Sequence, residues 1–426
     1  MVLEDLNGAA ALDAADELAP LRDAFLFPEA RGGGELRYFA GHSLGLQPRG
    51  ARGLVLEALD DWAKFGVDGH FASKNAWMPY HELLTDSTAR LVGALPHEVV
   101  VMNTLTVNVH LMLASFYRPT SARYKILIEG GAFPSDQYAV ASQARWHGFE
   151  PGAAVVELVP RPGEPHLRDE DILQTIAENG EQIALILLGN CNYLTGQAYD
   201  IAAITRAGHE RGCVVGFDLA HGAGNLELAL HRDGPDFAVW CNYKYLNAGP
   251  GGLGGAFVHE RHATSVDLPR LAGWWGHDKQ TRFAMPPTFQ PIRGAEGWQL
   301  SNPPILQLAA LRASMELFDR AGMAALRRKS LALAAFLGQF LAELPAGQVE
   351  ILTPTAAHRR GTMCTIRVPE RGQALVETLH ERGILVDLRN PDIVRIAPVA
   401  LYTRFSDVAA LGGALLEFVT ERAPKC

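Results

Sequence analysis

Two residues in the middle of the chain have types and positions suited to one kind of cofactor chemistry. Asp218 ends the apolar run 214–218, and Lys244 follows a second apolar run, 237–240. A carboxylate that pairs with a pyridinium nitrogen and an amine that forms a Schiff base are the two groups that pyridoxal phosphate requires. Taken singly, Asp218 is more simply a turn-capping residue and Lys244 a surface lysine. Both follow expected strands, where open α/β sheets bind ligands, and together they predict a pyridoxal-phosphate site.

Residues that could bind the phosphate and the ring of this cofactor follow other expected strands. A phosphate needs backbone amides at a helix start together with hydroxyl groups, and Leu105 and Thr106 close a strand and open a helix. The segment Phe133-Pro134-Ser135-Asp136 begins another helix and offers an aromatic face for a planar ring. Plain helix capping explains both helix starts as well. His221 could stack on the ring or bond to it, and a structural histidine is an equally good interpretation.

A glycine-rich segment beyond the lysine resembles a different cofactor motif. Gly249-Pro250-Gly251-Gly252-Leu253-Gly254 has the G-x-G-x-x-G spacing of a dinucleotide fingerprint. That fingerprint should follow a strand and open a helix, whereas a strand-like run comes next and no acidic ribose ligand follows it. We therefore expect a tight turn and no dinucleotide site.

Short apolar runs alternate with helix-period segments between residues 97 and 260, which predicts a mainly parallel sheet covered by helices on both faces. The expected strands are 98–102, 124–128, 155–159, 183–188, 214–218, 237–240 and 255–258. The expected helices are 52–65, 106–116, 135–146, 169–178 and 201–211. Residues 273–304, rich in Trp, Gly and Pro, should form a long functional loop.

The later part of the chain predicts a smaller α/β domain. A long helical stretch at 304–343 precedes a strand at 362–368, a helix at 372–382, a strand at 393–397 and a final helix. A length of 426 residues suggests two domains. We expect a large domain at 51–300 and a small domain built from 1–50 and 301–426.

Bulk composition excludes several classes of protein. A net charge of −9 and a pI near 5.9 argue against a nucleic-acid surface. The longest apolar run, 183–188, is too short to span a membrane, and residues 1–20 lack the pattern of a signal peptide. The five cysteines form no Cys-x-x-Cys pair, so neither a metal site nor a disulfide framework is expected. A cytoplasmic location fits.

With these residues in hand, the chain resembles the kynureninase family, fold-type-I pyridoxal-phosphate hydrolases of tryptophan catabolism. The resemblance runs almost from end to end. The matching segments are Gly41 to Pro48, Asn103 to His110, Phe133 to Asp136, Thr195 to Gln197, Gly216 to His221, Asn242 to Gly252, Gly273 to His277 and Ser301 to Pro304.

The resemblance implies roles for particular residues. Lys244 would carry the cofactor and act as the proton carrier. The cofactor would be held by Leu105, Thr106, Phe133, Pro134, Ser135, Asp136, Asp218, His221 and Tyr243, and Tyr243 would either assist proton transfer or bind phosphate. Trp274 and Asn302 would reach the cofactor or substrate across a homodimer interface. Arg395, a charge within an apolar strand, would clamp the substrate α-carboxylate; by itself it could equally form a structural ion pair. His70 and Asn302 would face the aromatic end of the substrate.

The implied activity is hydrolysis of L-kynurenine, or its 3-hydroxy form, to anthranilate (or 3-hydroxyanthranilate) and L-alanine. Two segments depart from the family: His42 stands where many relatives have Asn, and Gly189 falls where relatives often offer a hydroxyl group. A desulfurase of the same cofactor class would need a mobile thiol, and the expected strand position of Cys364 does not favour one. A non-catalytic scaffold is the remaining alternative, against which Asp218, Lys244 and Arg395 argue together.

Overall fold

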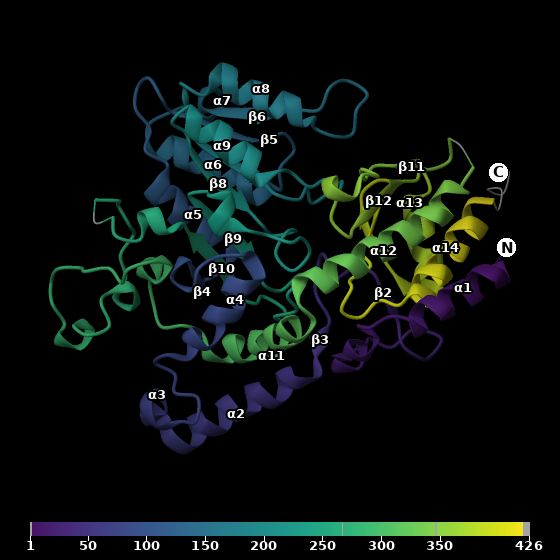
Figure 1. Cartoon of the computed structure of the whole chain (residues 1–426), viewed down its shortest axis with the longest axis horizontal. Coiled ribbons are helices and arrows are strands. Elements are labelled where there is room, and N and C mark those ends of the chain that lie inside the picture. The colour runs from purple at the N-terminus through teal and green to yellow at the C-terminus, as the bar shows by residue number, and fades with distance from the viewer. Residues whose placement is uncertain (1, 266, 346, 421–426) are drawn as a thin grey trace.

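The computed structural model describes residues 2–265, 267–345 and 347–420. Figure 1 shows two lobes joined side by side: a large one built on a central sheet, and a small one that contains both α1 (Val2–Ala14) and α14 (Phe405–Thr420), near the two ends of the chain. Within the described residues, no helix is both long and apolar enough to cross a membrane.

The large lobe contains the predicted seven-stranded sheet. Its strands are β4 (Val99–Met102), β5 (Lys125–Glu129), β6 (Val155–Leu158), β7 (Ile183–Gly189), β8 (Val214–Asp218), β9 (Phe237–Cys241) and β10 (Gly254–Val258). Their order across the sheet is β4-β10-β9-β8-β7-β5-β6. Only the two pairings of β10 are antiparallel, so the expectation of a mainly parallel sheet is confirmed.

Both faces of this sheet are buried, which explains why its strands are mostly apolar. In β4, Val99 and Val101 face one core, whereas Val100 and Met102 face the other. The helices of this lobe are α4 (Thr85–Val92), α5 (Leu105–Phe116), α6 (Pro134–Trp146), α7 (Pro151–Ala154), α8 (Asp169–Asn179), α9 (Ile201–Glu210) and α10 (Leu230–Asp233). Apolar residues of α5 and α6 pack on one face, and those of α8 and α9 pack on the other.

Two further sequence predictions can be compared with the structure. The glycine-rich segment after Lys244 is a turn, with Gly249 and Gly251 at positive φ, and β10 follows it as expected. The predicted helical stretch at 304–343 is confirmed and consists of two helices, α11 (Ile305–Ala321) and α12 (Met323–Ala342). Gly322, at φ 73°, separates them, because this backbone conformation ends a helix and suits a residue without a Cβ.

The small lobe contains a four-stranded antiparallel sheet of order β11-β12-β15-β14. These strands are β11 (Glu350–Ile351), β12 (Cys364–Arg367), β14 (Asp387–Arg389) and β15 (Ile393–Ile396), and α13 (Gly372–Glu381) packs with them. Short strands also tie the amino-terminal segment together: β2 (Arg37–Tyr38) pairs with β13 (Ile384–Leu385), and β1 (Phe25–Leu26) pairs with β3 (Gln47–Pro48). The carboxylate of Asp13 accepts hydrogen bonds from the first amides of α14.

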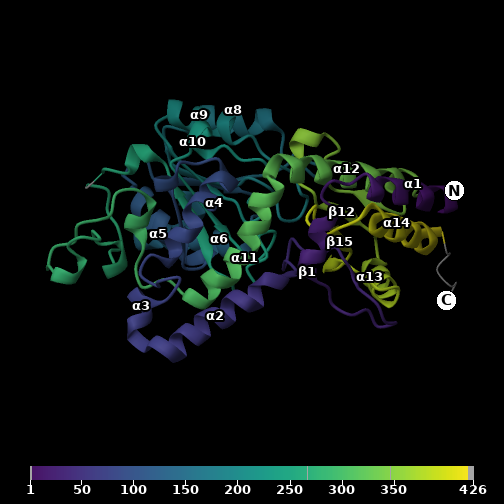
Figure 2. The same ribbon diagram turned by 60° about the horizontal axis from the view of Figure 1, so that its bottom comes forward.

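One long helix connects the two lobes along the lower side of the molecule. This helix, α2 (Arg49–Phe65), leads to the short α3 (Gly69–Ala72) and packs against α11 along its length (Figures 1 and 2). Residues of α11 share a buried cluster with the large sheet. The division of the chain at residues 50 and 300 therefore stays a prediction.

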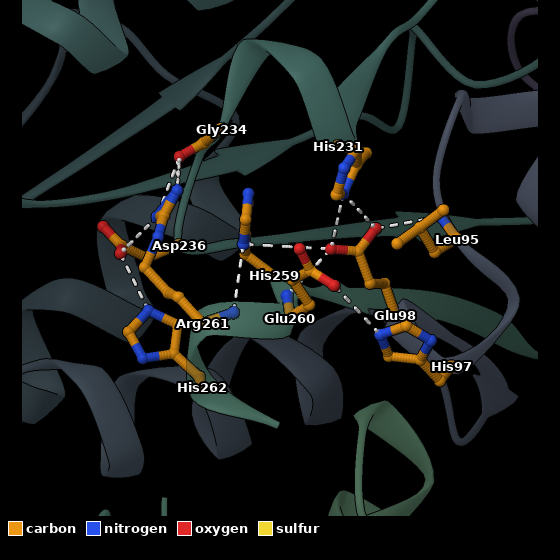
Figure 3. A network of polar contacts seen from close by, with 10 residues as sticks. All are labelled: Leu95, His97, Glu98, His231, Gly234, Asp236, His259, Glu260, Arg261 and His262. Carbon is orange, nitrogen blue, oxygen red and sulfur yellow. Dashed lines mark hydrogen bonds and ion pairs between the residues drawn. The ribbon is translucent and has the colours of Figure 1, made fainter. Parts of the chain in front are cut away.

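Histidines and carboxylates form a polar network at the edge of the large sheet where β4 and β9 begin (Figure 3). The fully buried Glu98 accepts hydrogen bonds from the Leu95 and Glu260 amides, and its Oε1 lies 3.1 Å from His231 Nδ1. The rings of His231 and His259 stack with only 20° between their planes. Glu98, His231 and His259 are close enough together to suggest a metal site. The lone pair of each imidazole nitrogen lies in its ring plane, and two nearly parallel planes do not direct both lone pairs at one metal ion. This cluster is therefore best explained as a hydrogen-bond network.

The second acid of this network is Asp236. It lies 2.9 Å from both His209 Nε2 and His262 Nε2, pairs with Arg261 at 3.0 Å, and accepts the Val215 amide. Burial by itself raises the pKa of Asp236, but the hydrogen bonds from the two histidines and the amide outweigh it and hold this pKa far below its ordinary value.

Replacing Asp236 by asparagine is expected to destabilise the protein by about 3–5 kcal/mol near neutral pH, because several buried donors lose their charged acceptor. A carboxylate with a depressed folded pKa stabilises above its unfolded pKa of about 3.9, and this contribution fades as the pH falls below that value. Urea unfolding should therefore show the difference between D236N and wild type shrinking in acid. Asp319, in an exposed pair with Arg90, is the control: D319N should cost less than about 1 kcal/mol at any pH.

Candidate active site

The sequence-predicted cofactor residues converge at the opposite edge of the large sheet. The strands β4, β5, β7, β8 and β9 all end there, and a cavity of about 160 Å³ opens beside them. The predicted residues that line this cavity are Leu105, Thr106, Phe133, Ser135, Asp136, Asp218, His221, Tyr243 and Lys244. Parallel strands that end together bring these distant segments into one place.

Two neighbouring acids lie at the base of the cavity. Asp218 ends β8, is only 7% exposed, and accepts the Ala220 amide at 2.7 Å. Burial, followed by the nearby Asp218 charge, raises the pKa of Asp136 well above its ordinary value. Burial also raises the pKa of Asp218, but Lys244 and the Ala220 amide oppose this effect. Asp136 is therefore the protonated member of the pair, and Asp218 holds the negative charge.

Lys244 lies close to a neutral histidine. Its Nζ is 3.1 Å from His221 Nε2 and 5.9 Å from the centre of the Phe133 ring. Burial and the Lys244 charge lower the pKa of His221 well below its ordinary value. Because the imidazole of His221 is uncharged, it places no second positive charge next to the Lys244 amine.

Two helices begin at the other end of the cavity. The hydroxyl oxygens of Thr106 in α5 and Ser135 in α6 are 2.7 Å apart. Helix amino termini present unpaired amides, so two adjacent termini with hydroxyl groups form a site for a phosphate. Pyridoxal phosphate requires a site for its phosphate and a carboxylate for its ring nitrogen. The two helix starts supply the first and the buried Asp218 supplies the second, so the residues present fit that cofactor.

Tyr243 precedes the lysine and contacts both the cavity and the amino-terminal segment. Its carbonyl accepts the Gly45 amide at 2.9 Å, while its side chain lines the cavity. Burial raises the pKa of Tyr243, and the neighbouring Cys241 raises it further. The phenol therefore keeps its proton near neutral pH and can donate a hydrogen bond.

The structure adds cavity residues that the sequence interpretation missed. Glu129, only 5% exposed, ends β5 as Asp218 ends β8, and that strand-end position was the available signal. Tyr199 donates a short hydrogen bond to Glu129, and Asn192 Nδ2 donates to it at 2.7 Å. Tyr193 also lines the cavity, as does Gly189, which the sequence marks as a departure from the family. The segment 189–192, which departs from the family pattern, is thus held by Glu129.

Five predicted residues are not among those that line the cavity: Pro134, His70, Trp274, Asn302 and Arg395. Pro134 is the exposed first residue of α6. His70 lies in α3, where its Nδ1 is 2.9 Å from the Val67 carbonyl. Trp274 and Asn302 are exposed, in the segments before α11. In this single chain the side chains of His70, Trp274 and Asn302 therefore lie outside the cavity lining, whereas Pro134 lies between two residues that belong to it.

Arg395 is buried in β15 and is already paired. Its Nη2 lies 2.7 Å from Asp387, and its Nη1 donates to the Tyr193 carbonyl at 2.8 Å. It is only 1% exposed. The ion pair left open by the sequence is present, and the Tyr193 contact joins this arginine to a residue that lines the cavity.

The four cysteines within the described part of the chain are all buried, and none of them is a reactive thiol. Cys364 is 2% exposed in β12, and burial raises its pKa. Burial likewise raises the pKa of Cys191, which lines the cavity, to about 12. Among the cysteines that the structure describes, none forms a disulfide. Cys426 lies outside the described residues.

Solved structures similar to this chain share its fold. A cystine C-S lyase C-DES mutant, with glycine linked to its pyridoxal-phosphate cofactor, has a TM-score of 0.74 at 20% identity and covers 88% of this chain and 96% of its own. The cysteine desulfurase CsdA from Escherichia coli also has a TM-score of 0.74, at 19% identity, with 95% and 99% coverage. At such low identity these structures show the fold-type-I architecture alone.

Sequence comparison is more specific. The chain is 62% identical to a kynureninase from Myxococcus xanthus, over 93% of each chain. It is 57% identical to a kynureninase from Koribacter versatilis, over 94% of this chain and 95% of the relative. A family model described as the kynureninase C-terminal domain matches residues 326–415. This chain therefore belongs to the kynureninase family.

Proposed function

We propose that this chain hydrolyses L-kynurenine, its 3-hydroxy form, or both, to L-alanine and anthranilate or 3-hydroxyanthranilate. The observation that carries the proposal is membership of the kynureninase family at 62% identity along nearly the whole chain. The protein is a pyridoxal-phosphate enzyme that acts on a carbon–carbon bond. It operates in the catabolism of tryptophan.

Pyridoxal phosphate, when bound, withdraws electrons from the α-carbon of an amino acid and so makes the proton on that carbon acidic. Asp218 would support this effect by supplying a negative charge to the ring nitrogen. Asp136 retains its own proton and holds Asp218 in place. Thr106, Ser135 and the first amides of α5 and α6 would hold the phosphate, and Leu105 and Phe133 would pack against the cofactor.

Lys244 would hold the cofactor through its side-chain amine, and the same amine is placed to carry the α-proton. Neutral His221 lies within hydrogen-bond distance of this amine and orients it. The phenol of Tyr243, protonated near neutral pH, donates to the phosphate or to the carbonyl oxygen of the substrate during cleavage. Water supplies the hydroxyl group that ends on the aromatic acid.

Substrate recognition uses residues around the cavity. Arg395 binds the α-carboxylate, since the bond from its guanidinium to the Tyr193 carbonyl brings it next to the cavity wall. His70 and Asn302 contact the aromatic end. They belong to segments that a single chain leaves outside the cavity, so their role requires a second subunit.

A homodimer with shared active sites accounts for the exposed apolar side chains near these segments. Phe71, Trp274, Phe283 and Met285 are 67%, 38%, 54% and 65% exposed. The Phe283 ring lies 6.4 Å from Phe71 and 5.5 Å from Trp274. A second copy would cover this patch and receive Trp274 and Asn302 in its own site. A cytoplasmic location and a lack of nucleic-acid partners complete the proposal, supported by the unpaired thiols and the net charge of −9.

The proposal is tested by incubating the purified holoenzyme with each kynurenine and following the release of fluorescent aromatic acid. We expect anthranilate and L-alanine in equal amounts from L-kynurenine. A comparison of kcat/KM for the two substrates then identifies the preferred ring. If neither aromatic acid is released from either substrate, the proposed activity is wrong.

Mixing two inactive variants tests whether active sites are shared. Trp274→Ala and Lys244→Ala homodimers should each be nearly inactive. If Trp274 reaches across the interface, mixed dimers contain one site with both wild-type residues, so mixing and re-equilibrating the subunits should restore up to roughly a quarter of the wild-type activity. Size-exclusion chromatography with light scattering checks the dimer, and activity that stays at the level of the separate variants would contradict sharing.

A further inference from the structure

His42 lies in a turn that the two lobes hold from opposite sides. On one side, the Ala397 amide donates to the Phe39 carbonyl at 2.8 Å, which places the turn beside the end of β15, the strand that carries Arg395. On the other side, the Gly45 amide donates to the Tyr243 carbonyl. The turn that carries His42 therefore lies between the segment of Lys244 and the strand of Arg395, and the charges of both residues act on the His42 ring.

The ring of His42 is buried with its hydrogen-bonding capacity unused. It is 1% exposed, and neither Nδ1 nor Nε2 has a partner among the described residues. Its ring centre is 6.4 Å from that of His221, whose Nε2 is in turn 3.1 Å from Lys244 Nζ. Because an unpaired buried polar group is costly, a group absent from the free chain should bind this imidazole during the reaction.

The surroundings of His42 favour a negatively charged group. Burial lowers the pKa of His42 well below its ordinary value, and the charges of Arg395, Lys244 and Arg389 lower it further. Asp387 pairs with both arginines, at 2.7 Å from Arg395 and 3.3 Å from Arg389. One carboxylate shared by two guanidinium groups leaves an excess positive charge. The imidazole itself is neutral and keeps one N–H to donate.

We propose that His42 is a specificity-determining residue that donates a hydrogen bond to the α-carboxylate of the bound amino acid, beside Arg395. The position fits this role because the carboxylate and the amine of an α-amino acid are separated by one carbon, and His42 lies between Arg395 and Lys244. The inference rests on the proposed function for the identity of the ligand as an α-amino acid.

The test compares two ligands that differ only in the carboxylate. L-Alanine and ethylamine are titrated into the holoenzyme, and the change in absorbance of the bound cofactor gives each Kd. His42→Ala should weaken L-alanine binding by roughly tenfold to a hundredfold, as for a lost hydrogen bond to a charged group, and ethylamine binding by less than about twofold. His42→Asn retains a donor and should recover most of the L-alanine affinity. His259→Ala, at the opposite edge of the sheet, is the matched control and should leave both values unchanged.

Two outcomes overturn the proposal: an L-alanine Kd that does not change in His42→Ala, or equal weakening for both ligands, which would indicate a bound water or a packing role.

If His42→Ala does not fold, the wild-type holoenzyme labelled with 13C at histidine Cε1 replaces it, with the His42 signal assigned from its loss in His42→Asn. That signal should move with L-alanine and not with ethylamine, and an equal response or none overturns the proposal. These binding measurements do not depend on kynurenine cleavage, so failure of the proposed activity remains distinguishable.

Discussion

Lys244→Ala is expected to lower kcat by at least about 10⁴-fold and to remove the visible absorption band of covalently held pyridoxal phosphate. In the proposed mechanism Lys244 supplies both the amine that binds the cofactor and the group that carries the α-proton, and such dual roles are the most costly to remove. Within the described residues that line the cavity, no second lysine could replace it. Stopped-flow spectra and anthranilate release measure the two losses separately.

A second substitution tests the role of the Lys244 amine separately from the role of its positive charge. Lys244→Arg keeps a positive charge near His221 and Asp218, but a guanidinium does not form the covalent bond or give up its proton. We expect it to be as inactive as Lys244→Ala, with an unchanged thermal melting temperature. Substantial turnover by either variant would show that another residue carries the proton.

The two acids at the base of the cavity should respond very differently to the same substitution. Asp218→Asn removes the negative charge that stabilises a protonated ring nitrogen, and kcat should fall by about 10³-fold. Asp136 is the protonated member of the pair, because burial and the neighbouring Asp218 raise its pKa. Asp136→Asn therefore replaces one neutral group by another, and we expect a loss of less than about tenfold. Steady-state kinetics with saturating cofactor measure both.

Which of the two variants, Asp218→Asn or Asp136→Asn, loses more kcat tests the assignment of charge within the pair. If Asp136→Asn were the more damaging change, the charge assignment within the pair would be wrong. Cofactor spectra of each variant between pH 6 and pH 9 provide the check, since only Asp218→Asn should lower the pKa of the bound ring nitrogen.

Much of the fold follows from local patterns. Each strand of the large sheet is a short, mostly apolar run, because both faces of the sheet are covered, and this composition is visible in the sequence. The boundary at Gly322 was missed, although glycine is a common helix terminator. The helical periodicity of the sequence continues on both sides of that residue. The stretch is divided by its tertiary packing: α11 packs on α2, whereas α12 packs in the small lobe.

The sequence by itself determined the strand-and-helix alternation and the polar residues at strand ends that line the cavity, with Asp218 and Lys244 foremost. These are local features: a strand end or a helix start is encoded by a few adjacent residues. Only the tertiary structure decided that Glu129 holds the segment of Asn192, that Asp387 is shared by two arginines, and that His42 lies between Lys244 and the strand of Arg395. These contacts join segments far apart in the chain, and they depend on the order of strands in each sheet and on how the two lobes pack, which no local pattern encodes.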